Sequence, residues 1–134
     1  MGEGNPGRLG RLGSERFVSL TTFKRDGRPV ASPMWVVEDG GGLWLWTPAE
    51  AAKVKRVRRN SRVALTPCGR TGKVRAGDAV ADGTAEVITD PDEVVRVESL
   101  IKRKYKIEYW VVTLIETIAA RGRKPRVILR ITVS

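Results

Sequence analysis

The fold is decided between residues 16 and 47, which read RFVSLTTFKRDGRPVASPMWVVEDGGGLWLWT. Two runs rich in β-branched and aromatic residues, 16–24 and 28–38, flank an Asp-Gly pair at 26–27. That pair is a strong hairpin signal, because glycine accepts the positive φ that a tight turn requires. A second, glycine-rich turn leads into the apolar run 43–47. These residues predict three antiparallel strands, each able to pair with its neighbour in sequence.

The rest of the chain adds helices and strands to this meander. Thr47 and Glu50 have the spacing of a capping box, with Pro48 at the first helical position, and predict a helix ending near Arg59. The other predicted elements are strands over 61–67 and 79–89 (with a bulge at Gly83), a loop over 69–78, helices from Pro91 and over 107–121, and a closing strand over 126–133. The β-branched content of residues 107–121 leaves a strand as the alternative there. About six antiparallel strands with helices at the connections favour a mainly β fold, a closed or split β-barrel, because closure removes exposed edges.

Composition limits the possible classes of protein. The 134 residues can bury a core without disulfides or metals, and we expect one domain over 14–134 after a loosely ordered arm, 1–13. One cysteine and no histidine exclude an internal disulfide and argue against a zinc site or a catalytic triad, so no metal is expected. With no apolar run long enough to cross a bilayer and no signal-peptide pattern, we expect a cytoplasmic protein with no membrane partner.

The strong positive charge points to an acidic partner. With 25 Lys and Arg against 15 Asp and Glu, the formal net charge is +10, which suits nucleic acid, a membrane surface or a polyanionic small ligand. Six basic residues fall between positions 53 and 62. Lys53 could reach back to the hydroxyl of Thr47 and bind a phosphate there, at about 1.5 to 3 kcal/mol. Arg56 lies on the same helical face, and Glu50 would keep the anion off the helix tip. A solvated basic face and a nucleic-acid patch remain the alternatives.

The aromatic strands supply a second candidate feature. Pro33 cannot donate to a strand ladder, so its strand must lie at an edge or bulge and leave backbone groups that a planar heterocycle could use. The alternative is that Met34 and Trp35 are ordinary core residues beside a proline kink. Trp44 and Trp46 share one strand face, and we assign them chiefly to packing.

These motifs occur in an order and at spacings that resemble a known family. The broad pattern comprises Gly27 to Pro29, Ser32 to Trp35, Leu43 to Thr47, Lys53 and Arg62 to Leu65. The narrower pattern comprises Pro67 to Arg70, Gly83 to Val87, Lys102 to Tyr105, Trp110 and the ending 124–130. Together they resemble the pyridoxamine 5'-phosphate oxidase-like (PPOX class) split β-barrel family, and within it the F420-dependent branch of flavin/deazaflavin oxidoreductases. The resemblance covers residues 14–133.

The resemblance implies a six-stranded antiparallel split β-barrel of the FMN-binding type. It also implies a homodimer with a flavin or deazaflavin in a groove at the dimer interface. By the same resemblance Ser32, Pro33, Met34 and Trp35 line the ring system, and Thr47 and Lys53 hold the phosphate, with Arg56 as a helper. The partner chain would complete the pocket, and no catalytic residue is assigned.

The function that follows is hydride transfer between coenzyme F420 and an electron-poor small-molecule substrate. A hydride carrier supplies the reactive atom itself, so the absence of histidine is no obstacle. The charge of +10 favours F420, with its phosphodiester and glutamate tail, over FMN. Three alternatives stay open: an FMN-binding oxidoreductase of the same fold, a non-catalytic cofactor-binding protein, and a basic small barrel that binds nucleic acid.

Overall fold

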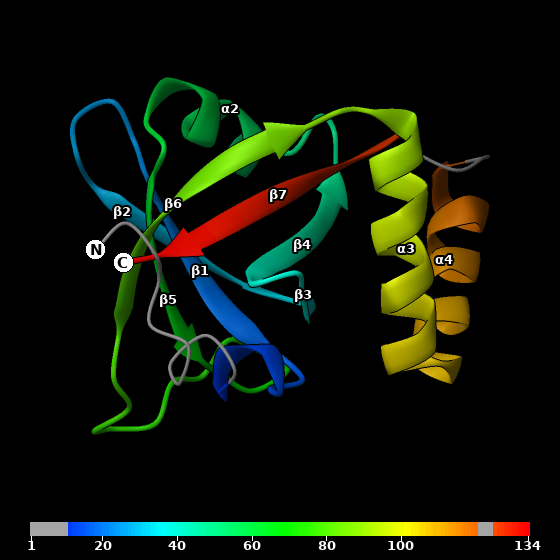
Figure 1. The fold of residues 1–134 in the computed structure, drawn as a ribbon, viewed down its shortest axis with the longest axis horizontal. Coiled ribbons are helices and arrows are strands. Elements are labelled where there is room, and N and C mark those ends of the chain that lie inside the picture. Colours follow the sequence, from blue (N-terminus) through cyan, green and yellow to red (C-terminus); the bar gives the residue numbers. More distant parts are fainter. Residues whose placement is uncertain (1–10, 121–124) are drawn as a thin grey trace.

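The computed structural model describes residues 11–120 and 125–134, which form a strongly curled antiparallel sheet with helices at one side and above (Figure 1). The sheet has seven strands in the order β2-β1-β5-β6-β7-β4-β3, and every pairing is antiparallel. The strands are β1 (Val18–Phe23), β2 (Pro29–Met34), β3 (Val36–Asp39), β4 (Gly42–Pro48), β5 (Arg62–Pro67), β6 (Ala81–Ile88) and β7 (Arg126–Val133). The prediction of a mainly β fold of split-barrel type is therefore confirmed.

The two edge strands of the sheet are halves of one stretch of chain. The run 28–38 was predicted as a single strand, but it breaks at Trp35 into β2, which pairs with β1, and β3, which pairs with β4. This break raises the strand number from the predicted six to seven. Because one residue separates the strands at opposite ends of the sheet order, the sheet must curl until its edges meet at Trp35. The hairpin at 26–27 is confirmed, and Gly27 has a φ of 87°.

The helices lie where the sequence predicted, but the first one begins differently. They are α2 (Ala52–Arg59), α3 (Pro91–Tyr105) and α4 (Ile107–Ala120). The predicted capping box is wrong: α2 has Ala51 at its N-cap, with no side-chain cap bond, while Thr47 and Pro48 belong to β4. The reason is long-range, since pairing with β7 extends along β4 as far as Pro48 and Arg126 and imposes strand geometry on Thr47.

A second local correction concerns Gly83. The pairing of β6 with β5 and with β7 runs through this residue without an inserted position, so there is no bulge. Instead, a Cβ at Gly83 would lie 2.5 Å from the carbonyl oxygen of Thr132. Glycine is needed there because the two backbones approach closely.

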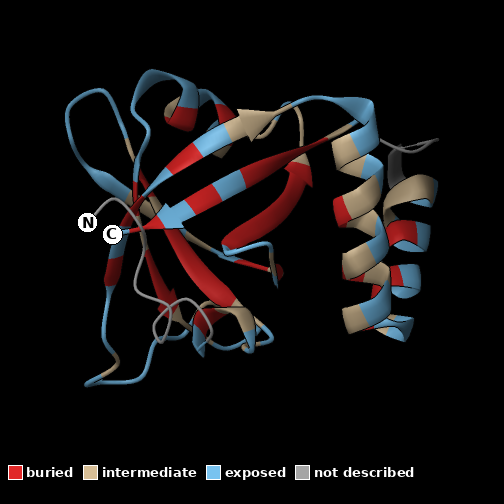
Figure 2. Cartoon of the chain, viewed as in Figure 1, coloured by how far each residue is buried: buried red, intermediate tan, exposed pale blue. Residues whose placement is uncertain are grey.

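The buried side chains form two clusters on the two faces of the curled sheet (Figure 2). The inner cluster fills the barrel and includes Leu20, Leu45, Leu65 and Leu129, and Leu12 from the segment before β1 joins it. The outer cluster lies between the sheet and α3 and comprises Val37, Trp44, Trp46, Val97, Ile101, Tyr105, Tyr109 and Ile128. The second cluster is the one that positions the candidate site, since it fixes Trp46 and Tyr105.

Helix α4 packs beside α3 and leaves much of its apolar surface exposed (Figures 1 and 2). Trp110 is 61% exposed and Ile118 is 70% exposed. The other exposed large apolar residues of this helix are Ile107, Val111, Val112, Leu114 and Ile115. The prediction of a helix is confirmed, but its apolar stripe faces outward. Within the described ranges, no helix is long and apolar enough to span a bilayer.

Candidate functional site

A cavity of about 340 Å³ opens where the break at Trp35 meets the end of β4. Its volume lies at the lower end of the usual range for small-molecule sites in proteins. It is lined by Phe17, Pro33, Met34, Trp35, Trp46, Thr47, Pro48, Lys53, Arg70, Val112 and Arg126. Five of the seven predicted site residues, Pro33, Met34, Trp35, Thr47 and Lys53, thus come together in one cavity, from three separate elements of the chain.

The aromatic wall of the cavity is a stack of three rings. Trp35 lies 4.6 Å, centroid to centroid, from Tyr105, with 15° between the ring planes. Trp46 is parallel to Trp35 within 3° at a centroid distance of 6.5 Å. Stacked rings of this kind hold one another in a fixed orientation, so this wall is preorganised for a flat ligand. Trp46 was assigned chiefly to packing, and the structure gives it both roles: it is 6% exposed and it lines the cavity.

Two buried polar atoms of the lining residues have no hydrogen-bond partner among the described residues. They are the indole nitrogen Nε1 of Trp46 and the hydroxyl Oγ1 of Thr47. Leaving a buried donor or acceptor unsatisfied costs about 1 to 3 kcal/mol, and native proteins rarely accept it without a reason. The indole N–H can only donate, while the hydroxyl can donate or accept. Both atoms therefore suit a ligand with oxygen acceptors, such as a phosphate or a ring carbonyl.

Lys53 adds a positive charge to the same cavity. Its amine is about half-buried, and burial first, then the charge of the neighbouring Arg56, lowers its pKa. No acidic side chain in 11–120 or 125–134 forms an ion pair with it. An unpaired, partly desolvated cation beside a free hydroxyl is an arrangement that an anion would stabilise.

The other two predicted site residues lie outside the lining of the cavity. Arg56 donates from Nε to the hydroxyl of Thr22 at 2.7 Å, which directs its guanidinium toward β1. It acts on the site through its charge, which lowers the pKa of Lys53. Ser32 pairs with Leu20 in the β1–β2 ladder and is only partly exposed.

Two arginines that were not among the seven predicted site residues also line the cavity. Arg126 stands opposite Pro48 in the β4–β7 ladder, and its guanidinium lies 3.9 Å from the centroid of the Trp46 ring. Its side chain is 11% exposed and forms an ion pair with Glu116 of α4. Arg70 follows β5 in the basic loop, and its guanidinium lies 5.4 Å from the Phe17 ring. Both fall within the family-like motifs, Pro67 to Arg70 and 124–130, but their place in the cavity depends on pairings between distant strands.

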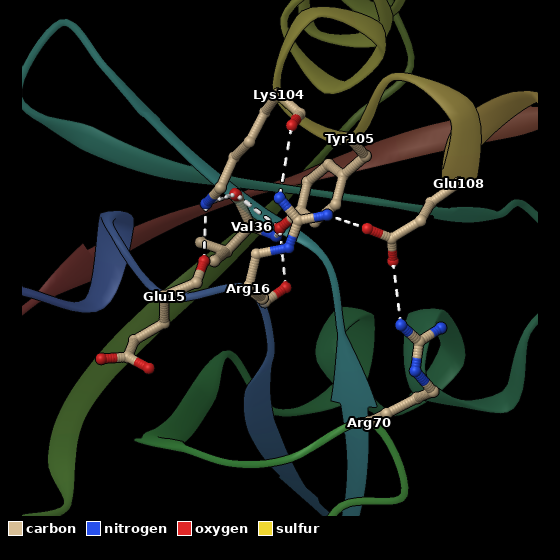
Figure 3. Close-up of polar contacts among 7 residues, drawn as sticks. All are labelled: Glu15, Arg16, Val36, Arg70, Lys104, Tyr105 and Glu108. Atoms are coloured by element: carbon tan, nitrogen blue, oxygen red, sulfur yellow. Dashed lines mark hydrogen bonds and ion pairs between the residues drawn. The ribbon is translucent and has the colours of Figure 1, made fainter.

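A polar clamp holds the strand break on which Trp35 sits (Figure 3). The ammonium group of Lys104 donates to the carbonyl oxygens of Gly13 at 2.9 Å, Glu15 at 2.6 Å and Val36 at 2.7 Å. The hydroxyl of Tyr105 accepts from the backbone N–H of Val36 at 2.9 Å and lies 2.8 Å from the carbonyl oxygen of Arg16. The end of α3 therefore fixes both the break and the segment before β1.

Burial shifts the pKa values of both clamp residues. It lowers the pKa of Lys104 to about 8, with the charge of Arg16 acting in the same direction, and it raises the pKa of Tyr105 to about 12. At neutral pH the ammonium group thus keeps its three protons, one for each carbonyl oxygen, and the phenol stays protonated. The clamp therefore keeps its hydrogen bonds to the strand break beside Trp35 at neutral pH.

The model of the family described as pyridoxamine 5'-phosphate oxidase matches residues 10–134. The chain belongs to this family. The resemblance found in the sequence motifs is thereby confirmed, and the family includes flavin and deazaflavin oxidoreductases. No curated protein sequence matches the chain.

Solved structures share the fold of this family member over almost its whole length. A conserved hypothetical protein from Mycobacterium tuberculosis is 26% identical, with a TM-score of 0.69, covering 95% of this chain and 78% of its own. A protein described as an F420 reductase is 19% identical, with a TM-score of 0.60, and the match covers 92% of this chain and 91% of that protein. A FAD-binding protein from Mesorhizobium loti is 19% identical, with a TM-score of 0.57, covering 97% and 90%. At these identities the last two establish the fold alone.

Proposed function

We propose that the protein is an F420-dependent oxidoreductase, in which hydride passes between the deazaflavin ring and an electron-poor small-molecule substrate. The observation that carries the proposal is the meeting of the Lys53 amine and the Thr47 hydroxyl, neither of which has a partner among the described residues, in one cavity with a stacked aromatic wall. A ligand with a phosphate and a flat ring would satisfy all three features. The structural likeness to an F420 reductase and the absence of histidine support the same class of chemistry.

The residues of the cavity fit such a cofactor in distinct roles. Lys53 and Thr47 would hold the phosphate, and the N–H of Trp46 would donate to an acceptor of the bound ligand. Pro33, Met34 and Trp35 would line the ring system and exclude water from one side. When bound, the deazaflavin supplies the hydride or accepts it, while the protein provides binding, orientation and electrostatics. Orientation of this kind is effective when the reacting carbons are held about 3 to 3.5 Å apart.

FMN is the principal alternative cofactor. Its phosphate would satisfy Lys53 and Thr47 equally well, and a FAD-binding protein shares the fold. The net charge of +10 favours the deazaflavin, because the additional carboxylates of the F420 tail match an extended basic surface better than FMN does. Binding of the cofactor without turnover would use the same contacts.

The proposed assembly is a homodimer in which a second copy covers the exposed apolar face of α4. Val112, from this face, lines the cavity and is 42% exposed, so a partner on α4 would also cover the cavity mouth. The sequence of α4 has two acidic residues, Glu108 and Glu116, and no basic one. That charge disfavours an anionic lipid surface and suits a protein partner. Sedimentation should give twice the mass of the chain, and Trp110→Lys should shift it to a monomer.

The experiment that tests the proposed function is a side-by-side titration of the purified protein with F420, FMN and a random oligonucleotide. Quenching of tryptophan fluorescence, checked by calorimetry, reports each affinity, since Trp35 and Trp46 line the cavity. We expect F420 to bind at about micromolar concentration or better, and more tightly than FMN. Tighter binding of FMN than of F420 would make FMN the proposed cofactor. Tighter binding of the oligonucleotide, with a steep loss of affinity in salt, would contradict the proposal and indicate a nucleic-acid-binding protein.

A further inference from the structure

The positive charges of the cavity are unequally compensated. Among the described residues, three cations line it: Lys53, Arg70 and Arg126. Arg126 has a carboxylate of its own in Glu116, whereas Lys53 has none. Arg70 forms an ion pair with Glu108, at the start of α4, and Glu108 also forms one with Arg16. One carboxylate therefore faces two guanidinium groups, and this corner of the cavity keeps a surplus positive charge.

Arg70 and helix α2, which carries Lys53, contact opposite ends of β1. Arg70 stacks on Phe17, just before β1 begins, and the backbone N–H of Cys68 bonds to the carbonyl oxygen of Phe17 at 3.2 Å. Arg56, one turn after Lys53, bonds instead to Thr22 near the end of β1. Five strand residues separate these two points, a span of about 16 Å. With the phosphate at Lys53 and Arg126 paired to Glu116, Arg70 is the lining cation that remains for a substrate beside the ring.

Arg70 is held in a way that allows exchange (Figure 3). Its Nη2 lies 3.3 Å from Oε2 of Glu108, and its side chain is 72% exposed. Exposed ion pairs of this kind contribute little to stability, so replacing Glu108 by another carboxylate costs little. The guanidinium can therefore turn from Glu108 to a ligand without breaking a buried contact.

We propose that Arg70 is a specificity-determining residue that binds a carboxylate of the hydride acceptor, and that Glu108 occupies its place in the ligand-free protein. The acceptor class is then an electron-poor double bond that carries a carboxylate. This assignment rests on the proposed function for the position of the cofactor phosphate at Lys53. A planar fork of N–H donors matches a carboxylate, which gives arginine the geometry for this task. The ion pair between Arg70 and Glu108 shows that a carboxylate fits against this guanidinium.

The test compares an acid with its neutral amide. The probes are trans-cinnamate and trans-cinnamamide, which have the same flat shape and the same electron-poor double bond. Their affinities are measured by calorimetry for the wild type and for Arg70→Gln and Glu108→Gln, with oxidised F420 absent and then saturating. The matched controls are Arg75→Gln, from the same loop and paired with Asp78, and Glu86→Gln, exposed on β6.

The two variants should move the affinity for cinnamate in opposite directions. Arg70→Gln should weaken cinnamate binding about tenfold and leave cinnamamide unchanged, whereas Glu108→Gln should strengthen it about threefold by freeing the guanidinium. Equal affinity of Arg70→Gln and wild type for cinnamate would overturn the proposal. A tenfold loss of F420 affinity in Arg70→Gln would also overturn it, because the arginine would then serve the cofactor. Failure of the wild type to bind F420, with the cinnamate pattern intact, would remove the proposed cofactor and leave the carboxylate site standing.

Discussion

Replacing Tyr105 with phenylalanine removes one oxygen atom from the clamp behind the cavity wall. The ring can stay stacked on Trp35, so the change isolates the hydroxyl. This hydroxyl accepts the backbone N–H of Val36, a residue that is 0% exposed, and lies 2.8 Å from the carbonyl oxygen of Arg16. Water cannot easily reach the N–H of Val36 to replace the lost partner.

The expected cost follows from those contacts. An unsatisfied buried N–H costs about 1 to 3 kcal/mol, and the bond lost at the Arg16 carbonyl adds to it, so Tyr105→Phe should lower the free energy of unfolding by about 2 kcal/mol. The loss should appear as a lower urea midpoint at unchanged m-value, followed by tryptophan fluorescence. Cofactor affinity should fall as well, since the strand break beside Trp35 would loosen.

Ser99→Ala is the matched control on the same helix. The Ser99 hydroxyl bonds to the carbonyl oxygen of Val95 within α3 and lies at the surface. Its removal should change the free energy of unfolding by less than about 0.5 kcal/mol. A Tyr105→Phe protein as stable as the Ser99→Ala protein would refute the reasoning that this hydroxyl fixes the break.

Three further predictions concern charge and close packing. The pKa of Lys104 falls from 10.5 to about 8 on folding, so between these pH values the unfolded state binds more protons than the folded state. The free energy of unfolding, measured by urea titration, should therefore rise with pH from about 8 to 10.5. Lys104→Met should remove that rise. Glu116→Ala leaves the guanidinium of Arg126 buried without its partner and should cost about 3 kcal/mol in the same assay, whereas a loss below about 1 kcal/mol would mean that the pair is solvated. Gly83→Ala puts a Cβ 2.5 Å from the carbonyl oxygen of Thr132. It should lower the free energy of unfolding by about 1 to 3 kcal/mol and so lower the thermal midpoint. An unchanged midpoint would contradict the close approach of β6 and β7.

Most of the secondary structure could be predicted from local sequence, because the signals were local. The turn at 26–27, the amphipathic face of α3 and the alternation in β7 each depend on a few neighbouring residues. The failures have long-range causes. Thr47 has the sequence of a helix cap, but its pairing with Val127 holds it in β4. The break at Trp35 depends on bonds from Lys104 and Tyr105, about 70 positions away.

The candidate site divides in the same way. Lys53 and Thr47 could be found because they are close in sequence, and the Pro33 to Trp35 strand because its proline is unusual. Arg126 and Arg70 could not, since each enters the cavity through strand pairings that no local pattern encodes. Trp46 was underestimated because its alternation with Trp44 indicates packing, whereas only the three-dimensional structure shows that its Nε1 lacks a partner among the described residues.

The most direct test of the account is the affinity of F420 for a Lys53→Met variant, measured by calorimetry beside wild type and Lys55→Met. Lys55 is two residues away on the same helix and exposed, so it controls for the loss of one positive charge. If Lys53 holds the phosphate, Lys53→Met should weaken F420 binding at least about tenfold, while Lys55→Met should stay within about twofold of wild type. Equal binding by Lys53→Met and wild type would contradict the phosphate site, and with it the proposed place of the cofactor.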